Sequence, residues 1–187
     1  MILPKKFYAR DPAIVAKEIL GCILVKKEHN PLKGKIVETE AYYGLSDPAS
    51  RAFKGKMNHN KWMWGEAGTL FIYMVHGNWL LNIITERKGT PSGILIRAVE
   101  PIDGMEEMKK RRNVEIKNLT SGPGKLTKSF GITKQHNGIK VYDPSSEIVV
   151  EKGEKPSKIK TSRRIGVKED LPQHLRFYID GNPFVSK

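Results

Sequence analysis

Short apolar segments alternate with turn-forming residues along the first hundred positions of the chain. β-branched and aromatic residues inside these segments favour strands over helices. We expect strands at residues 22–27, 33–43, 70–75, 78–85 and 93–100. His76-Gly77 separates the third strand from the fourth and predicts the tip of a tight hairpin.

Helix signals lie on both sides of this β-rich region. Asp11-Pro12 predicts a helix that ends at Gly21, because Asp is a favoured N-cap and Pro fits the first helical position. Asp103 and Glu106 fit a capping box for a second helix to about residue 112. A third helix is expected over residues 122–131, starting at Gly122-Pro123-Gly124 and ending at Gly131.

The remaining segments complete a single domain that spans residues 1–187. Closing strands are expected at 164–167 and 175–179, whereas 44–68 and 152–160 have the composition of loops. Trp62 and Trp64 inside the first loop favour order. The pattern predicts a mixed α/β fold with a mainly antiparallel sheet.

The strand predicted at 33–43 carries two carboxylates, Glu38 and Glu40, and a phenol, Tyr42. Side chains alternate along a strand, so these three should share one face, together with Ile36. The residues expected on the core-facing side are Val37, Thr39 and Ala41. Two carboxylates in such a segment are costly unless nearby chemistry uses their charge.

Charge changes this picture more than composition does. The chain has 33 Lys and Arg against 20 Asp and Glu, a net charge of +13 and a pI near 9.8. Such an excess predicts attraction to a polyanion, and the alternative is a Lys-rich solvated surface of the kind found in thermophile proteins. Cys22 is the single cysteine and the histidines show no ligand spacing with it, so we expect no disulfide, metal or cofactor.

No apolar run approaches the roughly 20 residues that cross a bilayer. The N-terminal residues lack the apolar core of a signal peptide. We therefore expect an intracellular, cytoplasmic and nucleoid-associated protein that binds no membrane.

Polar residues inside apolar strands are candidate site residues. Arg97 needs a carboxylate partner such as Glu38, Glu40 or Glu100, and a buried ion pair that fixes strand register is the simpler interpretation. Asn82 is either a satisfied core amide or an amide directed into a pocket.

Other candidates are weaker when taken alone. Tyr73 fits a half-buried strand position, and His76 at the hairpin tip is either simply exposed or a wedge between bases. Lysines near turns and a helix start can contact phosphates, although charge runs are usually solvated faces. These lysines are Lys54, Lys56, Lys61 and Lys125.

Several motifs in one consistent order resemble the alkyladenine (3-methyladenine) DNA glycosylase family over nearly the whole chain. The motifs are Ile36-Val37-Glu38-Thr39-Glu40-Ala41-Tyr42, Asp47-Pro48-Ala49-Ser50, Leu95-Ile96-Arg97-Ala98-Val99-Glu100-Pro101, Ser121-Gly122-Pro123-Gly124-Lys125-Leu126 and Arg176-Phe177-Tyr178-Ile179 followed by Gly181-Asn182 and Val185-Ser186. The resemblance implies a curved sheet with flanking helices and a protruding β-hairpin.

The resemblance also implies roles for individual residues. Glu40 would activate water and Arg97 would help to orient it. Tyr42 and Tyr73 would form opposite walls of a slot for a flipped base, where Asn82 discriminates against the guanine amino group. Leu95, in the same motif as Arg97, would also line this base pocket.

Two positions depart from the family pattern. Arg51 stands where the family commonly has a base-contacting His, which leaves the lesion preference open. His76 replaces the usual Tyr wedge at the hairpin tip, and Lys56 and Lys125 are the expected phosphate contacts.

The expected function is that of a monomeric, monofunctional DNA glycosylase. It would excise alkylated or deaminated purines from damaged double-stranded DNA, and no lysine matches a nucleophile position that would support strand cleavage. A non-catalytic nucleic-acid-binding module would leave Glu40 without a purpose. A structural ribonucleoprotein component would explain the charge but not Glu40, Arg97 and Asn82 inside apolar strands.

Overall fold

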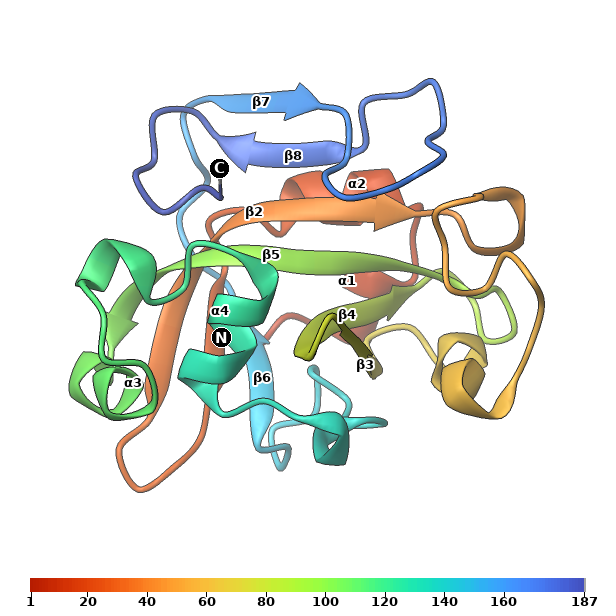
Figure 1. Cartoon of the computed structure of the whole chain (residues 1–187). Helices are drawn as coiled ribbons and strands as arrows, with labels where there is room; N and C mark the ends of the chain where they lie inside the picture. The colour runs from red at the N-terminus through yellow and green to blue at the C-terminus, as the bar shows by residue number, and fades with distance from the viewer. Residues whose placement is uncertain (187) are drawn as a thin grey trace.

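The computed structural model describes residues 1–186, which form one curved antiparallel sheet covered by short helices (Figure 1). Its strands are β1 (Ile23–Lys26), β2 (Leu32–Tyr42), β3 (Leu70–Val75), β4 (Asn78–Thr85), β5 (Ser92–Asp103), β6 (Ile148–Glu151), β7 (Ile159–Ser162) and β8 (Arg176–Ile179). The α-helices are α1 (Lys5–Tyr8), α2 (Pro12–Glu18), α3 (Met105–Arg111) and α4 (Pro123–Phe130). The 3-10 helices are η1 (Gly44–Ser46), η2 (Asn58–Trp64), η3 (Ile116–Asn118) and η4 (Lys134–His136). The predicted mixed α/β class is confirmed.

The sheet follows the order β3-β4-β5-β2-β1-β6 and branches at β2. One edge of β2 pairs with β5, whereas the other edge is shared by two strands. β1 pairs with residues 32–35, and β8 pairs with residues 38–40. In Figure 1, β8 therefore lies beside the carboxylate-bearing half of β2, and β7 lies on the outer side of β8.

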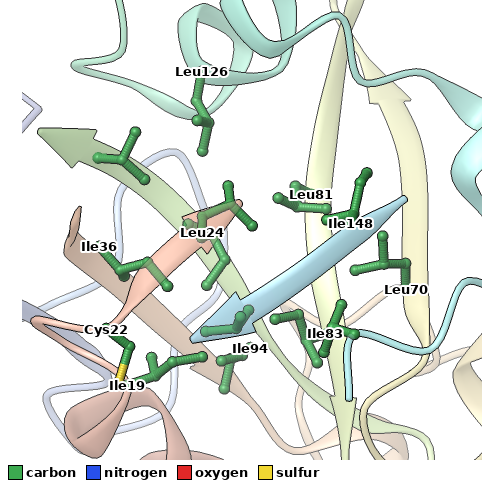
Figure 2. Packing of buried hydrophobic residues seen from close by; sticks show 14 of the residues in the cluster. Ile19, Cys22, Leu24, Ile36, Leu70, Leu81, Ile83, Ile94, Leu126 and Ile148 are labelled. Carbon is green, nitrogen blue, oxygen red and sulfur yellow. The ribbon is translucent and has the colours of Figure 1, made fainter. Parts of the chain in front are cut away.

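The core lies between the sheet and the helices. Asp11 caps α2 by accepting hydrogen bonds from the backbone N–H groups of Ala13 and Ile14, at 2.8 and 3.2 Å, as its sequence predicts. Figure 2 shows how Ile19, which follows α2, and Leu126 of α4 pack with strand residues. Among the described residues, no helix combines the length and apolarity needed to cross a membrane.

The pairing of β2 with β5 shifts register three times, once next to Lys33 and twice around Glu38, where the shifts are β-bulges. Ile36 pairs with Val99 and Glu38 with Ala98, so Val37 is an extra residue on β2. The next pair joins Thr39 to Ile96, which makes Arg97 an extra residue on β5. A bulge changes the alternation of side chains and redirects the extra residue.

The first bulge corrects one prediction. Ile36 was expected beside Glu38 but lies in the hydrophobic core (Figure 2). Thr39 also faces that side, where its hydroxyl donates to the carbonyl of Ala16 at 2.7 Å. The extra Val37 shifts the alternation between these two positions, and no residue of the segment signals the shift.

The hairpin of β3 and β4 turns at His76-Gly77, as predicted. Val75 pairs with Asn78, and the two turn residues have φ angles of 47° and 76°. Two consecutive left-handed residues match the right-handed twist of a two-residue hairpin. Helix α4 lies close to this hairpin because Gly124 has no side chain, and a Cβ there would stand 2.7 Å from the Cβ of Asn78.

Two other predictions at element ends are wrong. The strand expected at 164–167 is irregular, and β7 lies earlier, at Ile159–Ser162, with its first two residues in the segment 152–160 that was expected to be a loop. The capping box does not form, because β5 continues to Asp103 and the left-handed Gly104 precedes α3. The Asp103 carboxylate instead accepts from the N–H of Gly104 at 2.9 Å.

Candidate active site

A cleft of about 1310 Å³ opens where the β3–β4 hairpin, the loop after β2, the start of α4 and the C-terminal segment converge. Seven of the predicted site residues line it: Tyr42, Arg51, Tyr73, His76, Leu95, Arg97 and Lys125. The cleft wall also carries three more basic residues, Lys54, Lys117 and Lys168, and one acidic residue, Glu169. The cleft therefore presents a positively charged surface.

Glu40 is fully buried directly behind residues that line this cleft. Its Oε1 accepts from the backbone N–H of Ile165 at 2.8 Å and lies 3.1 Å from Nη1 of Arg97. Its Oε2 accepts from the hydroxyl of Tyr42 at 2.7 Å. These donors stabilise the charge of a carboxylate that has no solvent-accessible surface, and Oε2 can still accept one more hydrogen bond.

Glu38 has a different environment, although it lies on the same face. Its Oε1 accepts from Nε of Arg97 at 2.9 Å, from Nε of Arg176 at 2.7 Å and from the Ser186 hydroxyl at 2.8 Å. Its Oε2 accepts from the backbone N–H of Ser186 at 2.6 Å. Glu38 therefore anchors Arg97 and the C-terminal segment, and it is surrounded by protein donors.

The bulge on β5 brings Arg97 between the two carboxylates. Arg97 is 6% exposed, and its guanidinium contacts both Glu38 and Glu40. The predicted ion pair is therefore formed with both partners on β2. The arrangement holds the Glu40 carboxylate next to a fixed cation at the wall of the cleft.

A smaller inner pocket adjoins the cleft behind the aromatic residues. Tyr42, Arg51, Tyr73 and Asn82 line it, and its volume of about 20 Å³ has room for roughly one water molecule. The guanidinium of Arg51 lies over the ring of Tyr73, 4.7 Å from the ring centre. Phe71 stacks on the same tyrosine with ring centres 5.2 Å apart.

Both tyrosines are neutral phenols at ordinary pH. Burial raises the pKa of Tyr42 well above its usual value, and the neighbouring Glu40 raises it further. Burial also raises the pKa of Tyr73, although Arg51 opposes this effect. Tyr42 therefore stays protonated and remains a hydrogen-bond donor to Glu40.

Asn82 is held by its own hairpin. Its amide donates to the backbone carbonyls of Phe71 and Leu80, both at 3.2 Å. It pairs in register with Leu95, which in turn pairs with Glu40 across β5 and β2. The amide is thus satisfied as a core group and also lines the inner pocket.

Two of the three residues expected as the wedge and the phosphate contacts line the cleft, and the third does not. His76 is exposed at the hairpin tip, and Lys125 lies at the start of α4. Both line the cleft. Lys56 is exposed and does not line the cleft, and its ammonium lies 6.0 Å from the centre of the Trp64 ring. Lys54 lies on the cleft wall instead.

The sequence did not reveal the role of Arg164. Its buried guanidinium forms a bidentate pair with Asp47 at 2.6 and 2.9 Å and contacts Asp170 at 2.7 Å. Burial opposes the charge, but the hydrogen bonds that Arg164 donates to both carboxylates raise its pKa. Arg163-Arg164 looks like an ordinary solvated basic pair, whereas Arg176 and Ser186 stood inside quoted motifs.

The site combines a buried carboxylate, a fixed guanidinium, an aromatic pocket and a basic cleft. Among residues 1–186, no three His, Cys, Asp or Glu side chains cluster as metal ligands. The chemistry that these groups offer is proton transfer to a carboxylate next to a stacked planar ligand.

Comparison with known proteins gives a consistent result. A family model described as methylpurine-DNA glycosylase matches residues 6–183. A relative from Clostridium perfringens (strain 13 / Type A), named "Putative 3-methyladenine DNA glycosylase", is 43% identical over 205 residues and covers both chains completely. Relatives with the same name come from Oceanobacillus iheyensis, 39% identical over 99% of this chain and 96% of its own, and from Methanoculleus marisnigri, 37% identical over both full chains.

Proposed function

The chain belongs to the methylpurine-DNA glycosylase family, and from this premise we propose that it flips alkylated or deaminated purines out of duplex DNA and hydrolyses their N-glycosidic bond. The basic cleft receives the damaged strand, because its lysines and arginines can neutralise phosphates. The reaction proceeds without strand cleavage.

The flipped base enters the slot between Tyr42 and Tyr73. Extrusion from the duplex costs a few kcal/mol, and it costs least for a damaged pair. Stacking on an aromatic ring returns about 1–3 kcal/mol per base. His76 at the hairpin tip fills the gap that the base leaves, and Lys125 contacts the backbone from the start of α4.

Hydrolysis follows at the sugar carbon that carries the base. The C1′–N bond breaks with its electron pair going to the base, and C1′ develops oxocarbenium character. A water hydrogen-bonded to Oε2 of Glu40 attacks C1′ and gives its proton to the carboxylate. The buried charge of Glu40 also stabilises the cationic sugar. A cationic alkylated purine departs as a neutral base.

One observation carries this proposal above the others. Glu38 and Glu40 lie two residues apart on one face, but four protein donors surround the Glu38 carboxylate and three contact that of Glu40. All three donors to Glu40 belong to residues that line the cleft. Glu40 is therefore the carboxylate that we assign to the attacking water. A module that only binds nucleic acid has no use for such a carboxylate behind its binding surface.

The test replaces Glu40 with Gln, which keeps the size of the side chain and removes its basicity. Glu40→Gln should lower base release from 7-methylguanine duplex by at least about 100-fold, because general bases contribute roughly 100- to 10,000-fold. Its affinity for the lesion duplex should stay within about threefold of the wild type.

Glu100→Gln is the matched control. Glu100 lies on the neighbouring strand β5, pairs with Lys35 at 2.7 Å and is outside the cleft lining. This control should release base at the wild-type rate. Turnover retained by Glu40→Gln would reject the assigned base, and wild-type binding without base release would favour the non-catalytic module. Strand cleavage without alkali would reject the monofunctional assignment.

A further inference from the structure

Arg164 lies just after β7 and contacts three separate parts of the chain. Its Nη1 and Nη2 donate to the two oxygens of Asp47, and Nη1 also donates to the backbone carbonyl of Ala41 at 3.0 Å. Its Nε and Nη2 donate to Asp170 at 2.9 and 2.7 Å. The side chain of Arg164 and that of Asp47 have no exposed surface. The guanidinium therefore has one fixed plane.

That plane lies against the catalytic region in two ways. The guanidinium carbon is 4.5 Å from the centre of the Tyr42 ring. The next residue, Ile165, donates its backbone N–H to Oε1 of Glu40 at 2.8 Å. One buried side chain thus contacts the Tyr42 ring, and the residue next to it in the chain donates to the Glu40 carboxylate.

The energetics do not favour a purely structural explanation. Burying a guanidinium with two carboxylates carries a large desolvation cost, and apolar side chains of similar volume hold segments together equally well or better. A planar cation with a bidentate partner supplies something that apolar packing lacks, which is a directional constraint. Here that constraint is transmitted to Tyr42 and to the backbone at Ile165.

We propose that Arg164 is a positioning residue for base excision: it fixes the plane of Tyr42 and, through the N–H of Ile165, the orientation of Glu40. This inference rests on the proposed function of Glu40 and Tyr42. Because Arg164 is absent from the cleft lining, its loss should affect the rate of bond cleavage more than the affinity for DNA.

Arg164→Lys is the informative substitution. Lysine keeps the positive charge beside Asp47, but its ammonium cannot form the same bidentate pair or stack a planar face on Tyr42. Single-turnover base release at saturating enzyme should fall about 30-fold, since misplacement by roughly 1 Å costs up to about 100-fold. The dissociation constant for lesion DNA should change less than about threefold.

Arg111→Lys is the matched control. Arg111 is a partly buried arginine in an ion pair, with Nη2 2.8 Å from Glu28, and it lies on α3 outside the cleft lining. Arg111→Lys should lower thermal stability and leave the single-turnover rate within about twofold of the wild type. Temperatures are chosen at which both variants are folded.

A second readout does not depend on activity. In protein labelled with 3-fluorotyrosine, the resonance of Tyr42 is identified by its loss in Tyr42→Phe. Arg164→Lys should shift or broaden this resonance, and Arg111→Lys should leave it unchanged. If the wild type released no base, the proposed function would fail while this measurement still tested the contact of Arg164 with Tyr42.

Asp170→Asn provides the same test in a milder form. It removes the negative charge of one partner of Arg164 and leaves the pair with Asp47, so it carries the test if Arg164→Lys does not fold. Its rate should fall about three- to tenfold with affinity maintained. A full rate in the folded variant together with an unmoved Tyr42 resonance would leave Arg164 with a structural role alone and overturn the proposal.

Discussion

Arg51 occupies the place where a flipped base is proposed to stack. Its guanidinium covers Tyr73 at 4.7 Å, and the remaining inner pocket has a volume of only about 20 Å³. The backbone at Arg51 is held, because Asn60 donates to its carbonyl at 2.8 Å. The side chain itself is exposed and can rotate. A purine must therefore displace Arg51 from Tyr73 before it can stack.

Two energies follow from this geometry. A cation–π contact at an exposed site is worth about 0.5–1 kcal/mol, which every entering base must replace. A cationic base also experiences repulsion from the displaced guanidinium, about 0.6 kcal/mol at roughly 7 Å in water. Removing the charge of Arg51 should thus help neutral bases about two- to fivefold and cationic bases about 6- to 15-fold.

Arg51→Gln removes the charge and keeps a side chain of similar reach. The assay mixes duplexes with 7-methylguanine, which is cationic, and hypoxanthine, which is neutral, and measures both values of kcat/KM in one reaction. The ratio of cationic to neutral excision should rise about threefold in Arg51→Gln. Arg51→Lys retains the charge and should keep the wild-type ratio. An unchanged or lower ratio in Arg51→Gln would refute the electrostatic reasoning.

Two further predictions concern surface charge and stability. The logarithm of the DNA association constant should fall linearly with the logarithm of the salt concentration. Lys125→Gln should reduce the size of this slope by about 0.9, whereas Lys17→Gln, on α2, should leave it unchanged. A flat plot would exclude a phosphate-dominated interface. Burial would raise the pKa of Glu28, but hydrogen bonds from Arg111 and Lys26 outweigh it and lower this pKa. Glu28 therefore stabilises the fold at pH values above its unfolded-state pKa of about 4.3 and loses this effect as the pH falls through its lower folded-state pKa. Glu28→Gln should lower the free energy of unfolding by about 1.5 kcal/mol at about pH 7 and by much less near about pH 3, as measured by urea denaturation. An equal cost at both pH values would contradict this sign.

Local patterns were sufficient for most elements of the fold. Turn residues and apolar runs predicted the β3–β4 hairpin, and the Asp-Pro and Gly-Pro-Gly signals predicted α2 and α4. These features depend on neighbours in the sequence, which is why they could be predicted. The failures at Asp103 and at residues 164–167 depend on tertiary partners: β2 extends the pairing of β5, and side-chain bonds occupy Arg164.

In the candidate site, too, features set by neighbouring residues could be predicted and features set by distant residues could not. Alternation placed Glu38, Glu40 and Tyr42 on one face, and their contacts agree with it: Arg97 contacts both carboxylates, and Tyr42 donates to Glu40. The partners of these residues could not be found by spacing. Arg164 and Ser186 lie more than a hundred residues away from their partners Asp47 and Glu38. Nothing near Arg164 in the sequence distinguishes a buried cation from a solvated one, and Ser186 stands out only as part of a family motif.

The two neighbouring bulges explain why regular alternation placed Glu38, Glu40 and Tyr42 on one face correctly but placed Ile36 wrongly. A regular β5 would set Arg97 opposite a single β2 residue, with its side chain committed to one face by the register. As an unpaired residue between Ala98 and Ile96, Arg97 instead contacts two carboxylates that lie two positions apart on β2. The extra Val37 on β2 precedes the same point and shifts Ile36 into the core without moving Glu38 and Glu40 from their common face. The irregular pairing thus places one cation between Glu38, which anchors the C-terminal segment, and Glu40, which lies directly behind the cleft wall.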